Sequence, residues 1–186
     1  GIEGETQDAA ILEDRSYTVK ALLASLFLAN GTPMLLAGDE FGNSQQGNNN
    51  SYCQDNPITW LDWQQADEAL QGYTRDLIRL RQEIKLLGDD VWWKQERVRW
   101  LNIQGEPMSE LCWHNRGAKA MQIVLDDEWL LLINAKRSQQ IFNLPQGSWQ
   151  ISCVPSEKFN YNADGKLTVE HMGIWILQRK NTSPNI

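Results

Sequence analysis

The sequence predicts a chain in two parts: residues 1–87 have the α/β pattern of part of a (β/α)8 barrel, and residues 88–186 form an antiparallel β-sandwich. Three observations predict this. A helical stripe precedes a short, wholly apolar run, a second helical stripe follows a long polar loop, and short β-prone runs separated by turn residues begin after Gly88.

The first helix is expected over residues 8–30. Apolar side chains recur at helical spacing over residues 17–27, and Asp8 is suited to cap the N-terminus. The end of this helix is expected at Gly31, because glycine can adopt the left-handed conformation that terminates helices. Pro33 then prevents the helix from continuing.

Residues 34–37 form a wholly apolar run. Its length and the flanking Pro33 and Gly38 favour a strand that is buried on both faces, as in a parallel sheet covered by helices. The polar stretch from Gly38 to about Pro57 is longer than most connections. Loops of this length are uncommon unless they have a function.

A second helix is expected over residues 66–87, where apolar residues recur at steps of three and four and Gly88 is the expected cap. A buried parallel strand needs neighbouring strands, and residues 1–87 encode no others. We therefore expect the chain to be a fragment. A buried strand with a functional loop at its carboxyl end is typical of one unit of a (β/α)8 barrel.

The sandwich is predicted from short β-prone runs that alternate with turn residues. The expected strands cover residues 98–103, 119–125, 129–134, 140–143, 148–154, 166–169 and 173–178.

Composition argues against several kinds of function. The formal net charge of −7 and pI of about 4.8 are unfavourable for a nucleic-acid partner or an anionic membrane surface. No apolar stretch approaches the roughly 18 residues of a membrane span. His114 and His171 have no evident catalytic partner and are expected to be structural. We expect no metal and no cofactor.

The three cysteines, Cys53, Cys112 and Cys153, are widely spaced, which fits reduced thiols in a cytoplasmic protein. The chain opens without an initiating Met, as expected of an excised piece. Nine tryptophans are many for 186 residues. Their rings suit both a β-sheet core and stacking on sugars, and the core is the more common role.

The long loop carries the candidates for chemistry. Its amide side chains match sugar hydroxyls, and Tyr52, Trp60 and Trp63 are candidate apolar platforms, although Asn-rich segments are also ordinary turn formers. Asp55 and Asp62 are expected to be turn or capping residues.

Asp39 and Glu40 are a tempting catalytic pair. Glycoside hydrolysis usually needs two carboxyl groups about 5–5.5 Å apart for retention or about 6.5–9.5 Å for inversion. Consecutive residues in an extended chain point to opposite faces, so a buried hydrogen bond or ion pair at the strand's end is the favoured role.

The strand and the loop together resemble a known family. Residues 31–42 (GTPMLLAGDEFG) resemble the eighth barrel strand of the α-amylase superfamily. Residues 46–50 (QGNNN), 52–56 (YCQDN) and 60–63 (WLDW) resemble the isoamylase and bacterial glycogen-debranching branch. The resemblance covers residues 1 to about 87, and the predicted sandwich lies where that family has its C-terminal β domain.

The resemblance implies a parent glycoside hydrolase that cleaves α-1,6 branch linkages of glycogen with retention. The family's Asp nucleophile, Glu general acid and second Asp lie upstream, so we expect no catalytic residue in this chain and no activity of the chain alone. The expected partners are a branched α-glucan, glycogen or limit dextrin, and the missing N-terminal part of the same enzyme. Asn49, Tyr52, Gln54 and Trp60 are the expected substrate-binding residues.

Two alternatives stay open. A non-catalytic carbohydrate-binding module is compatible with the sandwich and the tryptophans, but it would not need the barrel-like half. A structural module would cover the end of a barrel. If the chain is a fragment, we expect residues 34–37 and both helices to expose apolar surface in isolation.

Overall fold

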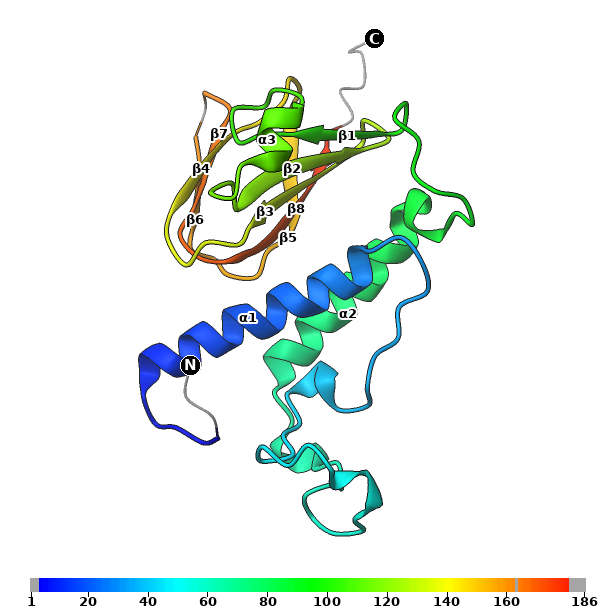
Figure 1. Cartoon of the computed structure of the whole chain (residues 1–186), viewed down its shortest axis with the longest axis vertical. Coiled ribbons are helices and arrows are strands. Elements are labelled where there is room, and N and C mark those ends of the chain that lie inside the picture. Colours follow the sequence, from blue (N-terminus) through cyan, green and yellow to red (C-terminus); the bar gives the residue numbers. More distant parts are fainter. Residues whose placement is uncertain (1–3, 163, 181–186) are drawn as a thin grey trace.

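The fold is that of a computed structural model, which describes residues 4–162 and 164–180. Three layers are stacked (Figure 1): the helices α1 and α2, a five-stranded antiparallel sheet and a three-stranded antiparallel sheet. The loop between the two helices extends away from the sheets, so that the loop and the sandwich lie at opposite ends of the long axis.

Helix α1 covers Ala9–Leu28, and Asp8 caps it as the sequence predicts. The Asp8 Oδ1 atom accepts hydrogen bonds from two backbone N–H groups of the first turn, at 2.9 and 3.4 Å. The predicted role of Gly31 as the helix terminator is wrong. Gly31 has a φ of 124°, but the helix has already ended, with Ala29 in an extended conformation.

Helix α2 covers Glu68–Glu83 and begins at Asp67, whose side chain accepts a hydrogen bond from the backbone N–H of Leu70 at 2.9 Å. The predicted cap at Gly88 is wrong. The α-helix ends at Ile84, and the chain then tightens into the 3-10 helix η4 (Lys85–Gly88), where the backbone N–H of Leu87 donates to the carbonyl oxygen of Ile84 at 2.9 Å.

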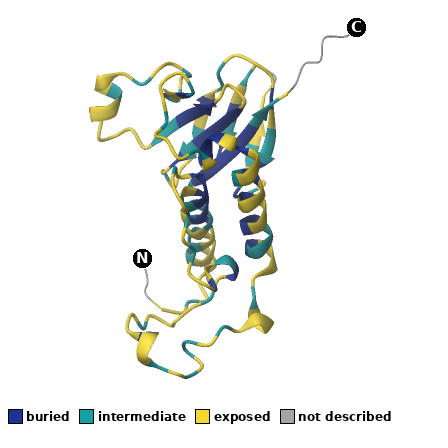
Figure 2. Cartoon of the chain, turned by 90° about the vertical axis from the view of Figure 1, so that its right-hand side faces the viewer, coloured by how far each residue is buried: buried dark blue, intermediate teal, exposed yellow. Residues whose placement is uncertain are grey.

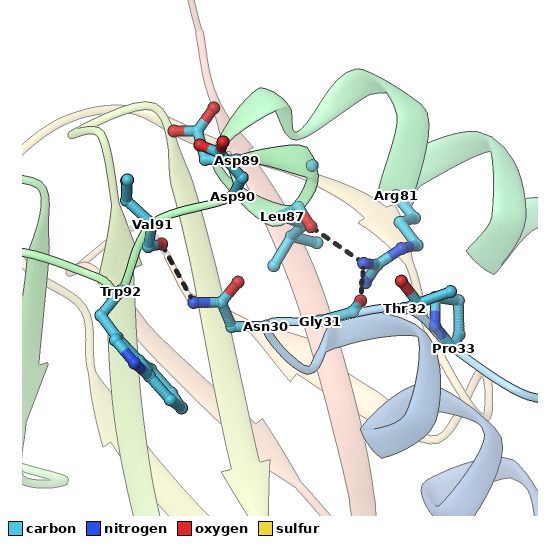
Figure 3. Close-up of a pocket in the computed structure, with 11 residues that line it drawn as sticks. Asn30, Gly31, Thr32, Pro33, Arg81, Leu87, Asp89, Asp90, Val91 and Trp92 are labelled. Carbon is cyan, nitrogen blue, oxygen red and sulfur yellow. Dashed lines mark hydrogen bonds between the residues drawn. The ribbon is translucent and has the colours of Figure 1, made fainter.

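Arg81 of α2 binds the carbonyl groups that end α1 (Figure 3). Its guanidinium donates to the carbonyl oxygens of Phe27 (2.6 Å), Ala29 (2.8 Å) and Gly31, and also to that of Leu87 (2.8 Å). These contacts replace the glycine turn that the sequence predicts. One cation therefore joins the ends of both helices and the start of the segment that leads to the loop.

The strand predicted over residues 34–37 is absent from the described part of the chain. Met34 and Leu36 are 88% and 65% exposed, because the chain supplies no neighbouring strand to pair with this segment. The prediction of exposed apolar surface is confirmed, since Leu22 of α1 is 65% exposed and Ile78 of α2 is 41% exposed.

The sandwich confirms the predicted strands to within a few residues at their ends. The five-stranded sheet has the order β1-β2-β3-β8-β5 and the three-stranded sheet the order β4-β7-β6. The strands are β1 (Val98–Leu101), β2 (Ala120–Leu125), β3 (Trp129–Asn134), β4 (Gln140–Asn143), β5 (Trp149–Cys153), β6 (Phe159–Tyr161), β7 (Lys166–Val169) and β8 (Gly173–Arg179).

Two elements of the sandwich region were not predicted, the strand β6 and the short helix α3 (Glu110–His114). Ser109 caps α3, because its side chain accepts from the backbone N–H of Cys112 at 3.3 Å. A serine directly before Glu110 is a helix-start signal that would have identified this element.

The five-stranded sheet is buried on both faces, as the dark blue strands of Figure 2 show. On one face Leu131 and Ile176 share a core with α1 and α2, and on the other Leu130 and Leu177 share a core with the three-stranded sheet. The first core crosses residue 87, and the division into two domains at that residue stays a prediction.

Replacing Arg81 with alanine is expected to lower the free energy of unfolding by about 2–3 kcal/mol, since hydrogen bonds to a charged group contribute about 1.5–3 kcal/mol each and partial exposure reduces the sum. Urea unfolding followed by tryptophan fluorescence measures the change. Arg79→Ala is the matched control, because the side chain of Arg79 is 56% exposed and pairs only at the surface with Asp76 and Glu83. Equal destabilisation by the two variants would contradict the role of Arg81.

The three cysteines are free, as predicted, and differ in environment. Burial raises the pKa of the Cys153 thiol to about 12, whereas a hydrogen bond with Ser109 lowers the pKa of the Cys112 thiol. Because thiolates are the reacting species, we expect Cys53 and Cys112 to react with a disulfide reagent at pH 8, and Cys112 to reach its maximal rate at a lower pH than an ordinary thiol. Peptide mapping that finds Cys153 labelled before unfolding would contradict its burial.

Candidate functional site

The loop between the helices carries all four predicted substrate-binding residues. It contains three 3-10 helices, η1 (Asp39–Phe41), η2 (Ser51–Cys53) and η3 (Trp63–Gln65). In Figure 1 the loop is the cyan segment farthest from the sheets. Its conformation therefore depends on anchors at its two ends and on hydrogen bonds within it.

Both ends of the loop are held next to helix α2. Phe41 is 3% exposed, and its ring centroid lies 4.4 Å from that of Trp63 at the far end of the loop. The carbonyl oxygen of Phe41 accepts from the backbone N–H of Asp67 at 3.0 Å. Asp62 accepts from the backbone N–H of Gln64 at 2.9 Å and so caps η3, which confirms its predicted role.

Gln54 organises the interior of the loop. Its Oε1 atom accepts from the side-chain amides of Asn48 (3.3 Å) and Asn56 (3.2 Å), and its carbonyl oxygen accepts from the hydroxyl of Thr59 at 2.9 Å. Asn56 in turn accepts from the backbone N–H of Ile58 at 3.0 Å. The side-chain oxygen of Gln54 is therefore occupied by hydrogen bonds within the loop.

The other three predicted residues face solvent. Tyr52 is 87% exposed, Trp60 is 57% exposed, and Asn49 is also exposed. The indole N–H of Trp60 donates to Asp55 Oδ1 at 2.7 Å, which fixes the orientation of the ring while its face stays open. The loop therefore presents aromatic and amide groups without enclosing them.

Asp39 and Glu40 do not have the geometry that the sequence predicts. They lie in η1 and not in an extended strand, because the strand before them does not form. Glu40 Oε2 accepts from the backbone N–H of Gly38 at 2.8 Å, so the predicted hydrogen bond exists but is local and only partly buried. Asp39 is exposed.

Both histidines make contacts within the fold, and their predicted structural role stays a prediction. His114 lies in α3 with its Nδ1 atom 2.8 Å from the carbonyl oxygen of Glu110. His171 stacks on Tyr17, with ring centroids 4.3 Å apart and an interplanar angle of 12°. Among residues 4–162 and 164–180, no group of three or more metal-binding side chains is placed to hold a metal ion. No helix in the described ranges is long and apolar enough to cross a membrane.

The pocket shown in Figure 3 lies between the segment that follows α1 and the segment that follows η4, with a volume of about 540 Å³. Its polar groups are engaged in structure. Arg81 binds carbonyl groups, Asn30 donates to the carbonyl oxygen of Val91 at 3.4 Å, and Asp89 pairs with Arg97 at 2.5 Å. These contacts favour a structural role for the pocket.

Tryptophans divide between the core and the surface. Trp129, Trp149 and Trp175 are at most 3% exposed, as the core role predicts. The five exposed ones, at 36% or more, are Trp60, Trp63, Trp92, Trp100 and Trp113. The core role is therefore wrong for Trp92, Trp100 and Trp113, whereas Trp60 and Trp63 lie in the polar loop, where the sequence indicates them as candidate platforms.

Comparison with known proteins agrees with the motifs of the loop. Residues 94–168 match a family described as glycogen debranching enzyme C-terminal domain. A glycogen operon protein GlgX homolog from Haemophilus influenzae is 54% identical over 156 residues, which are 81% of this chain and 24% of that protein. Over most of its length the chain is therefore similar to glycogen debranching enzymes, and residues 94–168 match the C-terminal domain of that family.

A glycogen debranching enzyme from Yersinia pestis is 51% identical to this chain over 152 residues, which are 81% of this chain and 23% of the relative. The chain thus spans about a quarter of the length of the relatives it matches. The family match lies on the sandwich, where the sequence motifs are weak, whereas the recognisable motifs lie in the loop.

Solved pullulanase structures share the fold. The pullulanase from Anoxybacillus sp. LM18-11, complexed with maltotriose, superposes with a TM-score of 0.68 at 16% identity, covering 95% of this chain and 24% of that one. The D350A pullulanase from Paenibacillus barengoltzii gives 0.68 at 24% identity, covering 95% and 27%. Helices and sandwich together therefore recur as one arrangement in larger enzymes.

Gly38 determines the start of the loop. Its φ is 102°, and a Cβ atom there would lie 2.6 Å from Asn43 Cβ and 2.9 Å from a methyl group of Leu61. We expect Gly38→Ala to open the loop and to speed limited proteolysis over residues 38–63. Gly72→Ala is the control, because its Cβ would meet no atom within 4 Å, and it is expected to stabilise α2 by about 0.5–1 kcal/mol. Unchanged proteolysis of Gly38→Ala would contradict this account.

Proposed function

We propose that this chain is the C-terminal portion of a glycoside hydrolase that cleaves α-1,6 branch linkages in glycogen with retention. The observation that carries the proposal is the combination of 54% identity to a glycogen operon protein homolog with an apolar segment, residues 34–37, that has no strand partner within the chain. In the whole enzyme this segment is the last strand of a (β/α)8 barrel, and the upstream part supplies its neighbours.

An open apolar hollow supports this arrangement. Its volume is about 320 Å³, and it lies between α1 and the start of the loop. Apolar lining comes from Leu22 and Leu35, and Val19 on the same helix is 36% exposed. Apolar surface of this kind on a helix and an unpaired segment indicates a missing packing partner. We assign that partner to the upstream barrel.

The isolated chain is expected to be inactive. Retaining hydrolysis needs two carboxyl groups on either side of one bond. Asp39 and Glu40 are adjacent in one 3-10 helix, and the Glu40 carboxylate is engaged by the backbone N–H of Gly38 at 2.8 Å. We therefore place the nucleophile and the general acid in the upstream part.

The loop is proposed to shape the substrate groove at the carboxyl end of that last strand. Tyr52 and Trp60 then supply ring faces for glucose units, and Asn49 supplies a donor and an acceptor. Gln54 is proposed to act indirectly, because its hydrogen bonds hold the conformation of the loop. Glycogen or a branched limit dextrin is the proposed substrate, and the cytoplasm, where glycogen is used, is the proposed location.

Reducing-sugar release tests the proposal. The chain and a longer enzyme, extended upstream through the barrel, are each incubated with a branched limit dextrin. Activity is expected only in the longer enzyme, and Trp60→Ala is expected to raise its KM about tenfold, because one stacking contact is lost. Tyr161→Ala, a 38% exposed aromatic on the outer sheet, is the matched control. Activity of the short chain that Asp39→Asn abolishes would overturn the proposal.

A further inference from the structure

A cluster of tryptophan rings lies at the surface of the sandwich, outside the loop. Trp93, Trp100 and Trp113 follow one another, with ring centroids 6.1 Å and 5.7 Å apart. Trp93 packs against the core between sheet and helices, whereas Trp100 and Trp113 are 36% and 51% exposed. The tilted and edge-to-face contacts hold the outer two rings in fixed orientations without burying them.

A hollow is lined by residues that lie close to these tryptophans in the chain, although neither Trp100 nor Trp113 is part of its wall. Its volume is about 290 Å³, and Cys112, the neighbour of Trp113 in α3, is part of its wall. The polar side chains that line it are four amides and two lysines, Asn102, Gln104, Asn115, Gln140, Lys119 and Lys136. The lining contains no carboxylate, although the whole chain carries a net charge of −7. Two of its amides are partly engaged in the fold, because Asn102 donates to Glu106 Oε2 at 3.1 Å and Asn115 accepts from the backbone N–H of Gly117 at 2.9 Å.

We propose that Trp100, Trp113 and this hollow form a second α-glucan-binding surface, separate from the loop. The inference rests on the proposed function, because the polymer it binds is the substrate of the parent enzyme. Fixed, half-exposed rings suit the apolar faces of glucose units, and amide and ammonium groups suit their hydroxyls. A neutral polyhydroxylated chain matches both features without needing a charge partner.

The position of the surface argues against the missing barrel as its occupant. Helix α3 lies on the sandwich, and the loop lies at the opposite end of the long axis (Figure 1). Because a glycogen particle presents many chain ends, a second site raises the effective concentration of substrate at the first. The surface thus holds the enzyme on the particle while the active site acts on individual branches.

Binding measurements on the chain test this inference directly. Glycogen co-sedimentation and calorimetry with maltoheptaose are compared for the unmodified chain, Trp113→Ala and Trp100→Ala. Each variant is expected to bind about tenfold more weakly, and Trp113→Phe, which keeps a ring, is expected to retain most of the affinity. Trp92→Ala, which removes an 85% exposed indole outside the cluster, is expected to leave binding unchanged. Near-ultraviolet circular dichroism confirms that each variant is folded.

Kinetics of the longer enzyme separate this inference from the proposed function. Trp113→Ala is expected to raise the KM for glycogen several-fold and to leave kcat, and the KM for a short branched oligosaccharide, unchanged. An inactive longer enzyme would refute the proposed function, while binding that depends on Trp113 would still support the second site. Unaltered binding of glycogen by the Trp100→Ala/Trp113→Ala double variant would overturn the inference. Loss of self-association in that variant without any glucan binding would overturn it as well, since the occupant would be a second copy.

Discussion

Burial of the five-stranded sheet on both faces is the constraint on which the remaining structure depends. One face needs the helices and the other needs the three-stranded sheet, because strands such as β3 are apolar along almost their whole length. An antiparallel sheet usually exposes one face to water. Here α1 and α2 cover one of the two faces. This packing fixes the position of both helices and of the loop between them.

The position of the loop depends on that packing. Arg81 ties the end of α1 to the end of α2, and Phe41 and Trp63 bring the two ends of the loop together beside α2. Between these anchors the loop contributes little to the core. Its shape comes from side-chain amides around Gln54, and this division leaves Tyr52 and Trp60 free to face a ligand.

The chain shows two kinds of exposed apolar surface, and they have different meanings. Residues 34–37 and the outer side of α1 are aliphatic and irregular, as expected of a surface that packs against more protein. Trp100 and Trp113 are aromatic and in mutual contact, and residues close to them in the chain line a hollow with amide groups, as expected of a surface that meets a sugar. Under the two proposals above, the first kind packs against the upstream part of the enzyme and the second binds the α-glucan.

By itself the sequence determined the helices, the cap at Asp8, most strands of the sandwich and the family, because these depend on local periodicity, turn chemistry and motif. Only the tertiary structure decided that Arg81 ends α1, that Asp39 and Glu40 share a 3-10 turn, and that Trp129 is buried while Trp113 is not. These outcomes depend on contacts between residues far apart in the chain. The strand predicted at residues 34–37 fails for the same reason, since a strand forms only where another strand lies beside it.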